Sequence, residues 1–477
     1  MKMYLAMFLL IGTASLSAQT DFDKKLAERD ARISELEARL GKLEEQKGDP
    51  LDEAVKEAEE TAKQDSKDEE KFGDDIWFHR TGPVTFRLID ISVDGLFSVG
   101  YSSRPNHETN ALQGGGHDPR RRGFTLNQVE LSFAGAVDPI LRAEAHMVVS
   151  EEGLELEEAF FQTIALPAGF QVEGGYFLTE FGRINPTHPH AWDFVDQPVA
   201  VTRIMGPEGM RGAGARLGWL LPTPWFFELH FGVQNGNDGS MVSFLGEGHE
   251  HGHGHEDEEE EHEESIGGYG AVERDIESFH EFVYLFRMHH HVDAGPFGVS
   301  LGISGLYGGN RSGDSGKTWI GGVDMTTKWA PEGTSKGTLF VKTQAEFLYR
   351  YYQADAFVHE GDPSDPLDDE AFDSTVLGDW GGYLYVMLGW HHGWQFGLRG
   401  EFADAFREGE LRRQDDPLRD RRYRGSALVE WEATEFSRFR LQYNFDHMEH
   451  LKDSTAHSVW FSVEILFGKH PAHNWAQ

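Results

Sequence analysis

The stretch HEHGHGHEDEEEEHEE, at residues 249–264, concentrates side chains that can bind metal ions. It holds five histidines and nine carboxylates in sixteen positions, with no apolar side chain among them. Its first five residues match the H-E-x-x-H pattern of zinc proteases, which requires a rigid helix that sets both histidines on one face. Gly252 and Gly254 alternate with histidine here. We therefore expect no catalysis from this stretch and predict that the chain is not an enzyme.

Metal capture is the chemistry that this stretch favours. Neutral imidazoles beside carboxylates suit zinc, nickel, copper or cobalt ions, and a flexible chain can gather several ligands. Ordering such a chain costs entropy, so we expect exchangeable capture of Zn²⁺ or a similar ion and no tightly bound cofactor. The alternative is a hydrated loop with no ligand. The predicted metal ligands are His249, His251, His253, His255 and His262.

A second group of metal-binding residue types lies in TEFGRINPTHPHAWDFVDQP, at residues 179–198. His188 and His190 are separated by one proline, and Asp193 follows them. Prolines fix the backbone and stiffen this segment. Two roles remain open for it. Either His188, His190 and Asp193 coordinate an ion, or the segment folds into a pore and narrows it.

Segments of alternating apolar and polar residues must position these groups. In FRLIDISVDGLFSVGY, residues 86–101, apolar side chains share one face, while Asp90, Ser92 and Asp94 share the other. This period of two is typical of a strand in a membrane barrel. About sixteen such segments follow one another, joined alternately by short turns and long loops, as in outer-membrane barrels. We therefore predict an all-β fold, a transmembrane antiparallel β-barrel of about 16 strands, with an N-terminal periplasmic coiled-coil helix.

The polar faces of these segments carry charged residues at mid-strand positions. In a soluble β-sandwich, which also alternates, such residues would point into a dry core at a high cost in free energy. In a barrel these charged residues line the pore, so their mid-strand positions favour a barrel over a sandwich. The predicted pore-lining residues are Asp90, Glu130, Arg142, Glu144, His146, Glu346, Arg350, Arg399, Glu401, Arg440 and Glu464.

Three segments precede the predicted barrel. The first has the short apolar run and the small residues of a secretory signal peptide. In the second, Leu26, Ile33 and Leu40 fall seven residues apart, which indicates a coiled coil, with a single charged helix as the alternative. The third is acidic and has few apolar residues to bury. The predicted boundaries are 1–18 for the signal peptide, 19–49 for the coiled coil, 50–75 for the acidic linker and 76–477 for the barrel.

The formal net charge of the chain is -38 at pH 7, and it contains no cysteine. A strongly acidic protein repels nucleic acid and attracts cations. An exported chain without cysteine cannot use disulfides and must gain its stability from its architecture. We therefore expect divalent metal ions and outer-membrane lipid as partners, and no nucleic acid.

The alternating segments and the third of the long loops, at residues 178–211, resemble those of phosphate-selective porin O/P-type outer-membrane channels. That resemblance implies a homotrimer and an inward fold of residues 178–211. Such channels use lysine and arginine along the pore, whereas this chain is acidic and its loops are rich in histidine. The segments GYFLTEFGRINPTHPHAWDF and GKHPAHNW are more similar to a histidine-rich branch of bacterial outer-membrane proteins with a possible link to zinc.

These observations predict a protein of the bacterial outer membrane with its coiled coil in the periplasm. We expect passive uptake of divalent transition-metal cations, zinc above others, with residues 249–264 capturing metal outside. Two alternatives remain open. One is a general or oxyanion porin, and the other is a barrel-anchored surface protein that sequesters metal.

Overall fold

The structure is a computed structural model that describes residues 78–468, apart from 82–83, 88, 111, 113, 152, 248–265, 270, 273, 332–338, 360–369, 392, 407–415 and 452. The chain divides into two compact units, Met1–Arg80 and Thr81–Gln477. The predicted signal peptide, coiled coil and acidic linker lie outside the described residues, and so does the histidine-rich stretch at residues 249–264.

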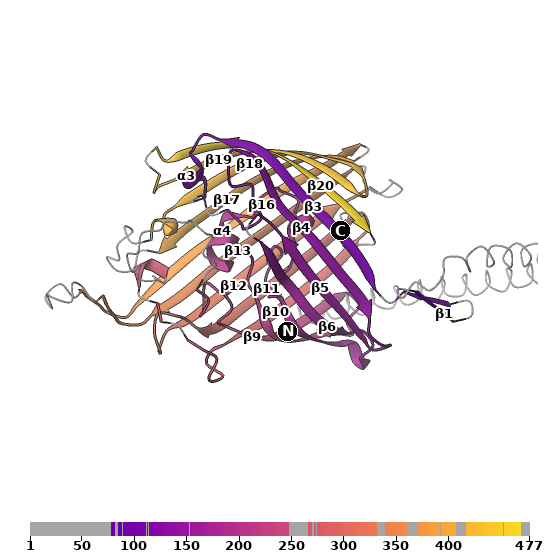
Figure 1. Ribbon diagram of the computed structural model, residues 1–477, viewed down its shortest axis with the longest axis horizontal. Helices are drawn as coiled ribbons and strands as arrows, with labels where there is room; N and C mark the ends of the chain where they lie inside the picture. The colour runs from indigo at the N-terminus through magenta and orange to yellow at the C-terminus, as the bar shows by residue number, and fades with distance from the viewer. Residues whose placement is uncertain are drawn as a thin grey trace, which may run out of the picture. The chain divides into compact units, whose positions relative to one another are not determined.

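Sixteen antiparallel strands form a closed barrel, which confirms the predicted fold (Figure 1). Neighbouring strands follow chain order, and the ring closes where β20 pairs with β3. The barrel strands are β3 (Asp90–Ser102), β4 (Gly123–Ala136), β5 (Leu141–Val149), β6 (Leu154–Thr163), β7 (Phe170–Leu178), β8 (Arg211–Leu220), β9 (Phe226–Asn235), β10 (Phe282–Ala294), β11 (Phe297–Gly309), β12 (Lys317–Trp329), β13 (Phe340–Ala354), β16 (Thr375–His391), β17 (Trp394–Phe406), β18 (Arg422–Thr434), β19 (Ser437–Met448) and β20 (Thr455–Gly468).

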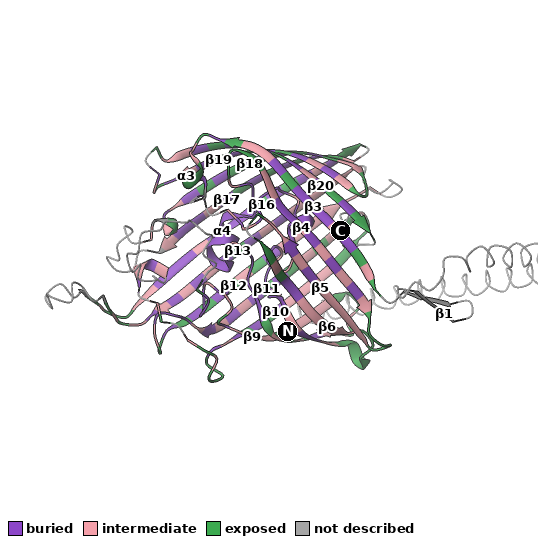
Figure 2. Cartoon of the chain, in the orientation of Figure 1, coloured by how far each residue is buried: buried purple, intermediate pink, exposed green. Residues whose placement is uncertain are grey.

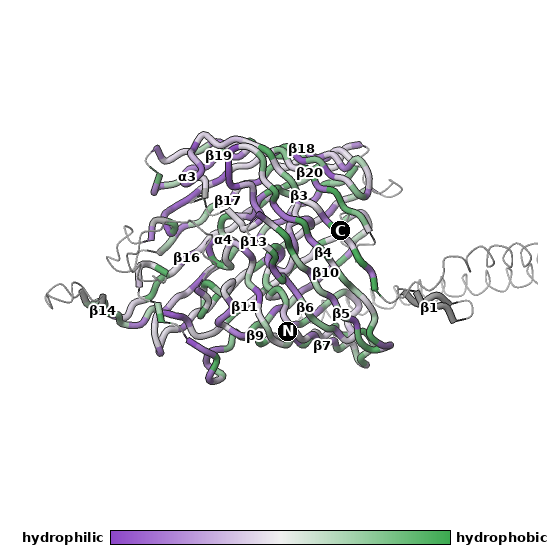
Figure 3. Tube along the Cα trace, viewed as in Figure 1, coloured by the Kyte–Doolittle hydropathy of each residue, from purple (hydrophilic) through white to green (hydrophobic). Residues whose placement is uncertain are grey.

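Alternation along each strand separates an apolar outer face from a polar inner face. In β20, Val459, Phe461 and Ile465 are exposed, whereas Ser462 and Glu464 are buried. The same alternation of buried and exposed residues, and of polar and apolar residues, runs along the other strands (Figures 2 and 3). An outward apolar band is what a barrel in a lipid bilayer requires.

Short turns join alternate pairs of strands, and longer loops join the others. Residues 295–296 connect β10 to β11, and residues 435–436 connect β18 to β19. By contrast, residues 103–122 connect β3 to β4, and residues 179–210 connect β7 to β8. With an even number of strands, the first and last barrel strands both have their free ends on the short-turn side. This is the arrangement that the alternating connection lengths predicted.

Residues 179–210, hereafter the inward loop, fold into the barrel. The loop contains the 3-10 helix η2 (Pro189–Ala191) and the helix α4 (Val199–Met205), whose residues are all buried. The helix α4 contacts β13, β16 and β17, while other parts of the loop bond to β6, β12 and β19. A segment that contacts strands all round a closed barrel lies inside it. The predicted inward course of this loop is therefore confirmed.

An apolar core holds the inward loop inside the barrel. Phe181 and Ile204 of the loop belong to one buried cluster with Leu306, Ile320 and Leu348, which project inward from β11, β12 and β13. Burying a large apolar side chain stabilises a fold by about 1.5–3 kcal/mol. The loop is thus packed as a core element, and ion pairs supplement this packing.

The remaining described elements are short. They are β1 (Phe78–Thr81), β2 (Val84–Arg87), α3 (Asn106–Asn110), η1 (Pro167–Gly169), η3 (Ile266–Gly268), η4 (Pro417–Arg419), and the paired strands β14 (Phe357–His359) and β15 (Glu370–Phe372). Within the described ranges, none of the helices has the length and hydropathy needed to cross a membrane.

Candidate functional site

Charged hydrogen bonds anchor the middle of the inward loop to three neighbouring strands. Asp196 accepts hydrogen bonds from Arg399 and, at 3.1 Å, from Arg424. The side-chain amides of Gln442 and Asn444 each donate to Asp196 at 2.7 Å. Burial alone would raise the pKa of Asp196, but the two guanidinium groups outweigh burial and hold this pKa at about 2. The carboxylate therefore stays ionised and fastens the loop to β17, β18 and β19.

Several predicted pore-lining residues hold the inward loop instead of lining an open pore. Glu401 accepts a hydrogen bond of 2.6 Å from the backbone N–H of Val199, the first residue of α4. Arg440 donates to the carbonyl oxygen of Trp192 at 3.0 Å, and Glu346 also accepts a bond from the loop backbone. These residues face inward as predicted. The loop covers them, which sequence periodicity alone could not indicate.

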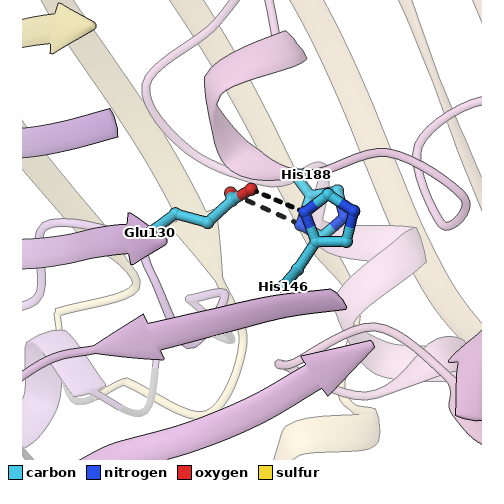
Figure 4. A group of neighbouring side chains, drawn as sticks. All are labelled: Glu130, His146 and His188. Carbon is cyan, nitrogen blue, oxygen red and sulfur yellow. Dashed lines mark hydrogen bonds and ion pairs between the residues drawn. The ribbon is translucent and has the colours of Figure 1, made fainter. Parts of the chain in front are cut away.

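Where the inward loop contacts β4 and β5, it lies next to a histidine and a carboxylate that project from these two strands. Glu130 Oε1 on β4 lies 3.0 Å from His146 Nδ1 on β5, and Glu130 Oε2 lies 3.6 Å from His188 Nδ1 of the loop. One ligand atom from each of the three lies within 4.8 Å of the other two. The Glu130 carboxylate points at both rings (Figure 4). All three side chains are buried, and this set of donors suits a zinc-type ion.

A β-bulge in β6 adds two further carboxylates to this cluster. The register between β5 and β6 shifts after His146 and leaves Glu157 as the extra residue. Glu157 and its neighbour Glu158 are consequently both buried on the inner side. They lie 2.9 Å from His188 Nδ1 and 2.8 Å from His188 Nε2, respectively. Bulges re-aim side chains and occur frequently at functional sites.

Two more histidines border the cluster. His190 Nδ1 lies 3.0 Å from Glu130 Oε2, and the His190 ring stacks on the His188 ring with centroids 5.6 Å apart. His117, from the first long loop, lies 3.1 Å from Glu208 of the inward loop. None of these histidines is more than 6% exposed. Two loops and the barrel wall therefore meet at one imidazole–carboxylate cluster.

The charge balance of the cluster differs from that of the other loop anchors. Within the described part of the chain, the ion-pair partners of Glu130, Glu157 and Glu158 are imidazoles and not guanidinium groups. Burial alone would lower the pKa of His188, but Glu130 and Glu157 raise this pKa well above 6.5. In the same way Glu208 outweighs burial and raises the pKa of His117 to about 10. Buried carboxylates need compensating positive charge, which here comes from protonated imidazoles or from a shared cation.

The structure brings together some of the predicted ligands and separates others. His188 and His190 lie in the cluster, next to the predicted pore-lining residues Glu130 and His146. Asp193 lies elsewhere. It pairs with Lys342 at 2.9 Å and accepts a hydrogen bond from the hydroxyl of Tyr385.

Two of the predicted pore-lining residues lie beside the cluster, and another lies at a strand end. Glu144 lies at the edge of the cluster, 3.6 Å from His146 Nε2, and pairs with Arg142 at 2.9 Å. Asp90 is the first residue of β3. The predicted external ligands His249, His251, His253, His255 and His262 lie outside the described residues.

Four residues of the cluster were not predicted from the sequence, namely Glu157, Glu158, His117 and Glu208. The segment ELEE at residues 155–158 was the available signal, because consecutive acids interrupt strict alternation in an otherwise regular strand.

A cavity of about 740 Å³ lies beside the inward loop, at the end of the barrel where the short turns lie. Arg183 and Lys342 line it together with Asp193. Thr187 and Ala191, from the same turn as His188 and His190, also face this cavity. The open space therefore reaches the immediate neighbours of the cluster.

The chain is similar to several known proteins. An uncharacterized protein of Aquifex aeolicus (strain VF5) is 28% identical over 450 residues, which cover 87% of this chain and 86% of that protein. OprB of Pseudomonas putida, in its high-pH structure, is similar with a TM-score of 0.51 and 10% identity, over 80% of this chain and 94% of OprB. The chain has a porin-like fold. The outer membrane channel DcaP of Acinetobacter baumannii has a TM-score of 0.49 and 10% identity, over 80% of this chain and 97% of DcaP. No protein-family profile matches the sequence.

Proposed function

We propose that the protein is an outer-membrane channel through which divalent transition-metal cations, zinc above others, diffuse into the periplasm. The observation that carries this proposal is the inward-facing cluster of His117, His146, His188 and His190 with its carboxylates. Imidazole and carboxylate together are the ligand set that proteins use for zinc and related ions. The cluster is buried where the inward loop meets the wall, so we infer from it the class of ion that the protein handles, and not the path that a passing ion takes.

Two features outside the cluster support the proposal. The net charge of -38 favours cations over anions near the channel mouth. The histidines of residues 249–264 are suited to weak, exchangeable capture of metal. A channel requires binding that is favourable enough for entry and weak enough for release.

A general porin is the second candidate, and the cavity beside the inward loop favours it. The cavity holds about 740 Å³ and is lined by the cations Arg183, Lys328 and Lys342 as well as by Asp193 and Asp293. This mixed lining offers no clear preference for either sign of charge. A small organic solute or an oxyanion would fit such a lining as well as a metal ion would.

Flux into proteoliposomes separates the two candidates. The purified protein is reconstituted into vesicles that contain a zinc-sensitive dye, and entry of zinc is compared with entry of labelled phosphate. We expect zinc entry to exceed phosphate entry clearly, and zinc entry to saturate. Equal entry of both solutes would support the general porin, whereas faster phosphate entry would contradict the metal proposal.

A further inference from the structure

We infer that Glu130, His146 and His188 hold one resident zinc-type ion, which clamps the inward loop to the barrel wall. The proposed function concerns ions that pass through the channel, whereas this ion stays at the loop and controls the width of the passage. The inference does not depend on which solute crosses the membrane.

The three donors come from three separate segments and converge on one point. Glu130 belongs to β4, His146 to β5 and His188 to the inward loop. Their ligand atoms lie within 4.8 Å of one another, so one ion can reach all three. Two imidazoles and one carboxylate form a typical set of protein ligands for zinc. His190 Nδ1, 3.0 Å from Glu130 Oε2, is close enough to provide a fourth ligand.

The surroundings of these donors match the outer shell of a metal site. His188 Nε2 lies 2.8 Å from Glu158 Oε2, which fixes the ring, while His188 Nδ1 faces both Glu157, at 2.9 Å, and Glu130, at 3.6 Å. On the other side, the Ser132 hydroxyl donates a hydrogen bond of 2.7 Å to Glu130 Oε1. Ligating histidines usually bond through their second nitrogen to a carboxylate, and ligating carboxylates are themselves hydrogen-bonded. Both features are present around Glu130 and His188.

Burial favours a resident ion over an ion in passage. Glu130 is 0% exposed, His146 3% and His188 4%. An ion bound there is enclosed between wall and loop, whereas ions in passage need a path that is open at both ends. Removal of that ion would leave these carboxylates paired with imidazoles alone, and an imidazole carries a positive charge only while it is protonated.

The contrast with the other anchors of the loop strengthens this inference. Where the loop meets β17 and β18, Arg399 and Arg424 supply permanent positive charge to Asp196. Where the inward loop meets β4 and β5, imidazoles supply the positive charge in place of arginines. An arginine anchor holds its partner regardless of metal supply, whereas an imidazole–carboxylate anchor tightens when an ion binds. One side of the loop is therefore fixed, and the other side responds to metal.

The test uses the full chain with His249, His251, His253, His255 and His262 replaced by serine, so that these histidines cannot contribute ligands. The metal content of the purified protein is measured, and Co²⁺ is titrated by its visible absorption after chelation. We expect one ion per chain. We expect His146→Ala and His188→Ala to lose this ion, and Glu158→Gln to weaken its affinity by roughly 10- to 100-fold, as for other outer-shell changes.

A matched control and a conductance measurement complete the test. His230 is also buried and lies 3.2 Å from Glu228, away from the cluster, so His230→Ala should keep the ion. Chelation by EDTA should raise single-channel conductance in the parent protein and leave that of Glu130→Gln, which keeps the side-chain shape, unchanged. Heat-dependent electrophoretic mobility verifies that each barrel has folded.

Three results would overturn the clamp. They are a parent protein that binds no ion, variants of His146 and His188 that keep parental affinity, and conductance that does not respond to EDTA. The clamp and the proposed function fail separately. A cation-selective channel without the ion contradicts only the clamp, and an anion-selective channel with the ion contradicts only the proposed transport.

Discussion

His188 Nε2 lies 2.8 Å from Glu158 Oε2, and this contact joins the inward loop to β6 of the barrel wall. The contact exists because a bulge turns Glu158 and its neighbour Glu157 inward together. A single irregularity in one strand thus determines the chemistry on one side of the loop. On another side the loop is held by Asp196 and its two arginines, so the inward loop has two anchors of different chemistry.

Acid should release the arginine-held side of the inward loop. The pKa of Asp196 is about 2 in the folded loop and 3.8 without a partner. Because the folded pKa is the lower one, the stabilisation is complete above pH about 4 and is lost as the pH falls towards 2. It amounts to something on the order of 2 kcal/mol. Single-channel conductance should therefore rise over this range.

The variant Asp196→Asn is the control for this acid response. It should show raised conductance already at pH 5 and no further rise between pH 4 and 2, because it has no carboxylate to protonate at this position. A parental channel whose conductance stays constant down to pH 2 would contradict this role of Asp196.

Gly182→Ala should displace the start of the inward loop. Gly182 has a φ of +66°, and a Cβ added there would lie 1.6 Å from Oε1 of Glu346 on β13. The left-handed backbone alone costs about 1–2 kcal/mol for a residue with a side chain, and the clash adds to this cost. We expect a lower unfolding temperature and higher conductance.

Gly321→Ala provides the comparison for Gly182→Ala. No atom lies within 4 Å of a Cβ added at Gly321 on β12, and its φ is ordinary. This variant should behave like the parent protein. Equal behaviour of the two variants would mean that the backbone at Gly182 does not position the loop.

Much of the fold could be predicted from residue patterns, because period two and connection length follow directly from a barrel in a membrane. The inward orientation of Glu130, His146 and Arg399 could be predicted in the same way. The position of the bulge at Glu157 could not, because a bulge locally breaks the period of two on which the strand prediction rests. The distance between Asp193 and the histidines could not be predicted either. It depends on the path of the folded loop, and a loop has no residue periodicity that would indicate this path.

The histidines of residues 249–264 should be responsible for external metal capture. Replacement of all five by serine should abolish the part of zinc binding that fades as the pH falls through about 6.5, since protonated imidazole cannot ligate. Isothermal titration measures this loss, and channel conductance should not change. Calcium should compete poorly against zinc. Zinc uptake that is unchanged in this variant at micromolar supply would contradict capture by this stretch.

The segment at residues 22–46 should hold the protein as a trimer. Leucine and isoleucine at its seam are compatible with several oligomeric states, and the trimer follows from the resemblance to trimeric porins. Cross-linking of the native protein should give a three-chain product, and deletion of the segment should reduce it. A monomeric native protein would contradict this prediction.

The ion selectivity of the open channel tests the central proposal most directly. Purified protein in a planar bilayer is exposed to a gradient of zinc chloride, and the voltage at which the current reverses is measured. We predict a reversal potential of the sign that zinc permeation produces. A reversal potential of the opposite sign, set by chloride, would contradict the account of this protein as a metal-cation channel.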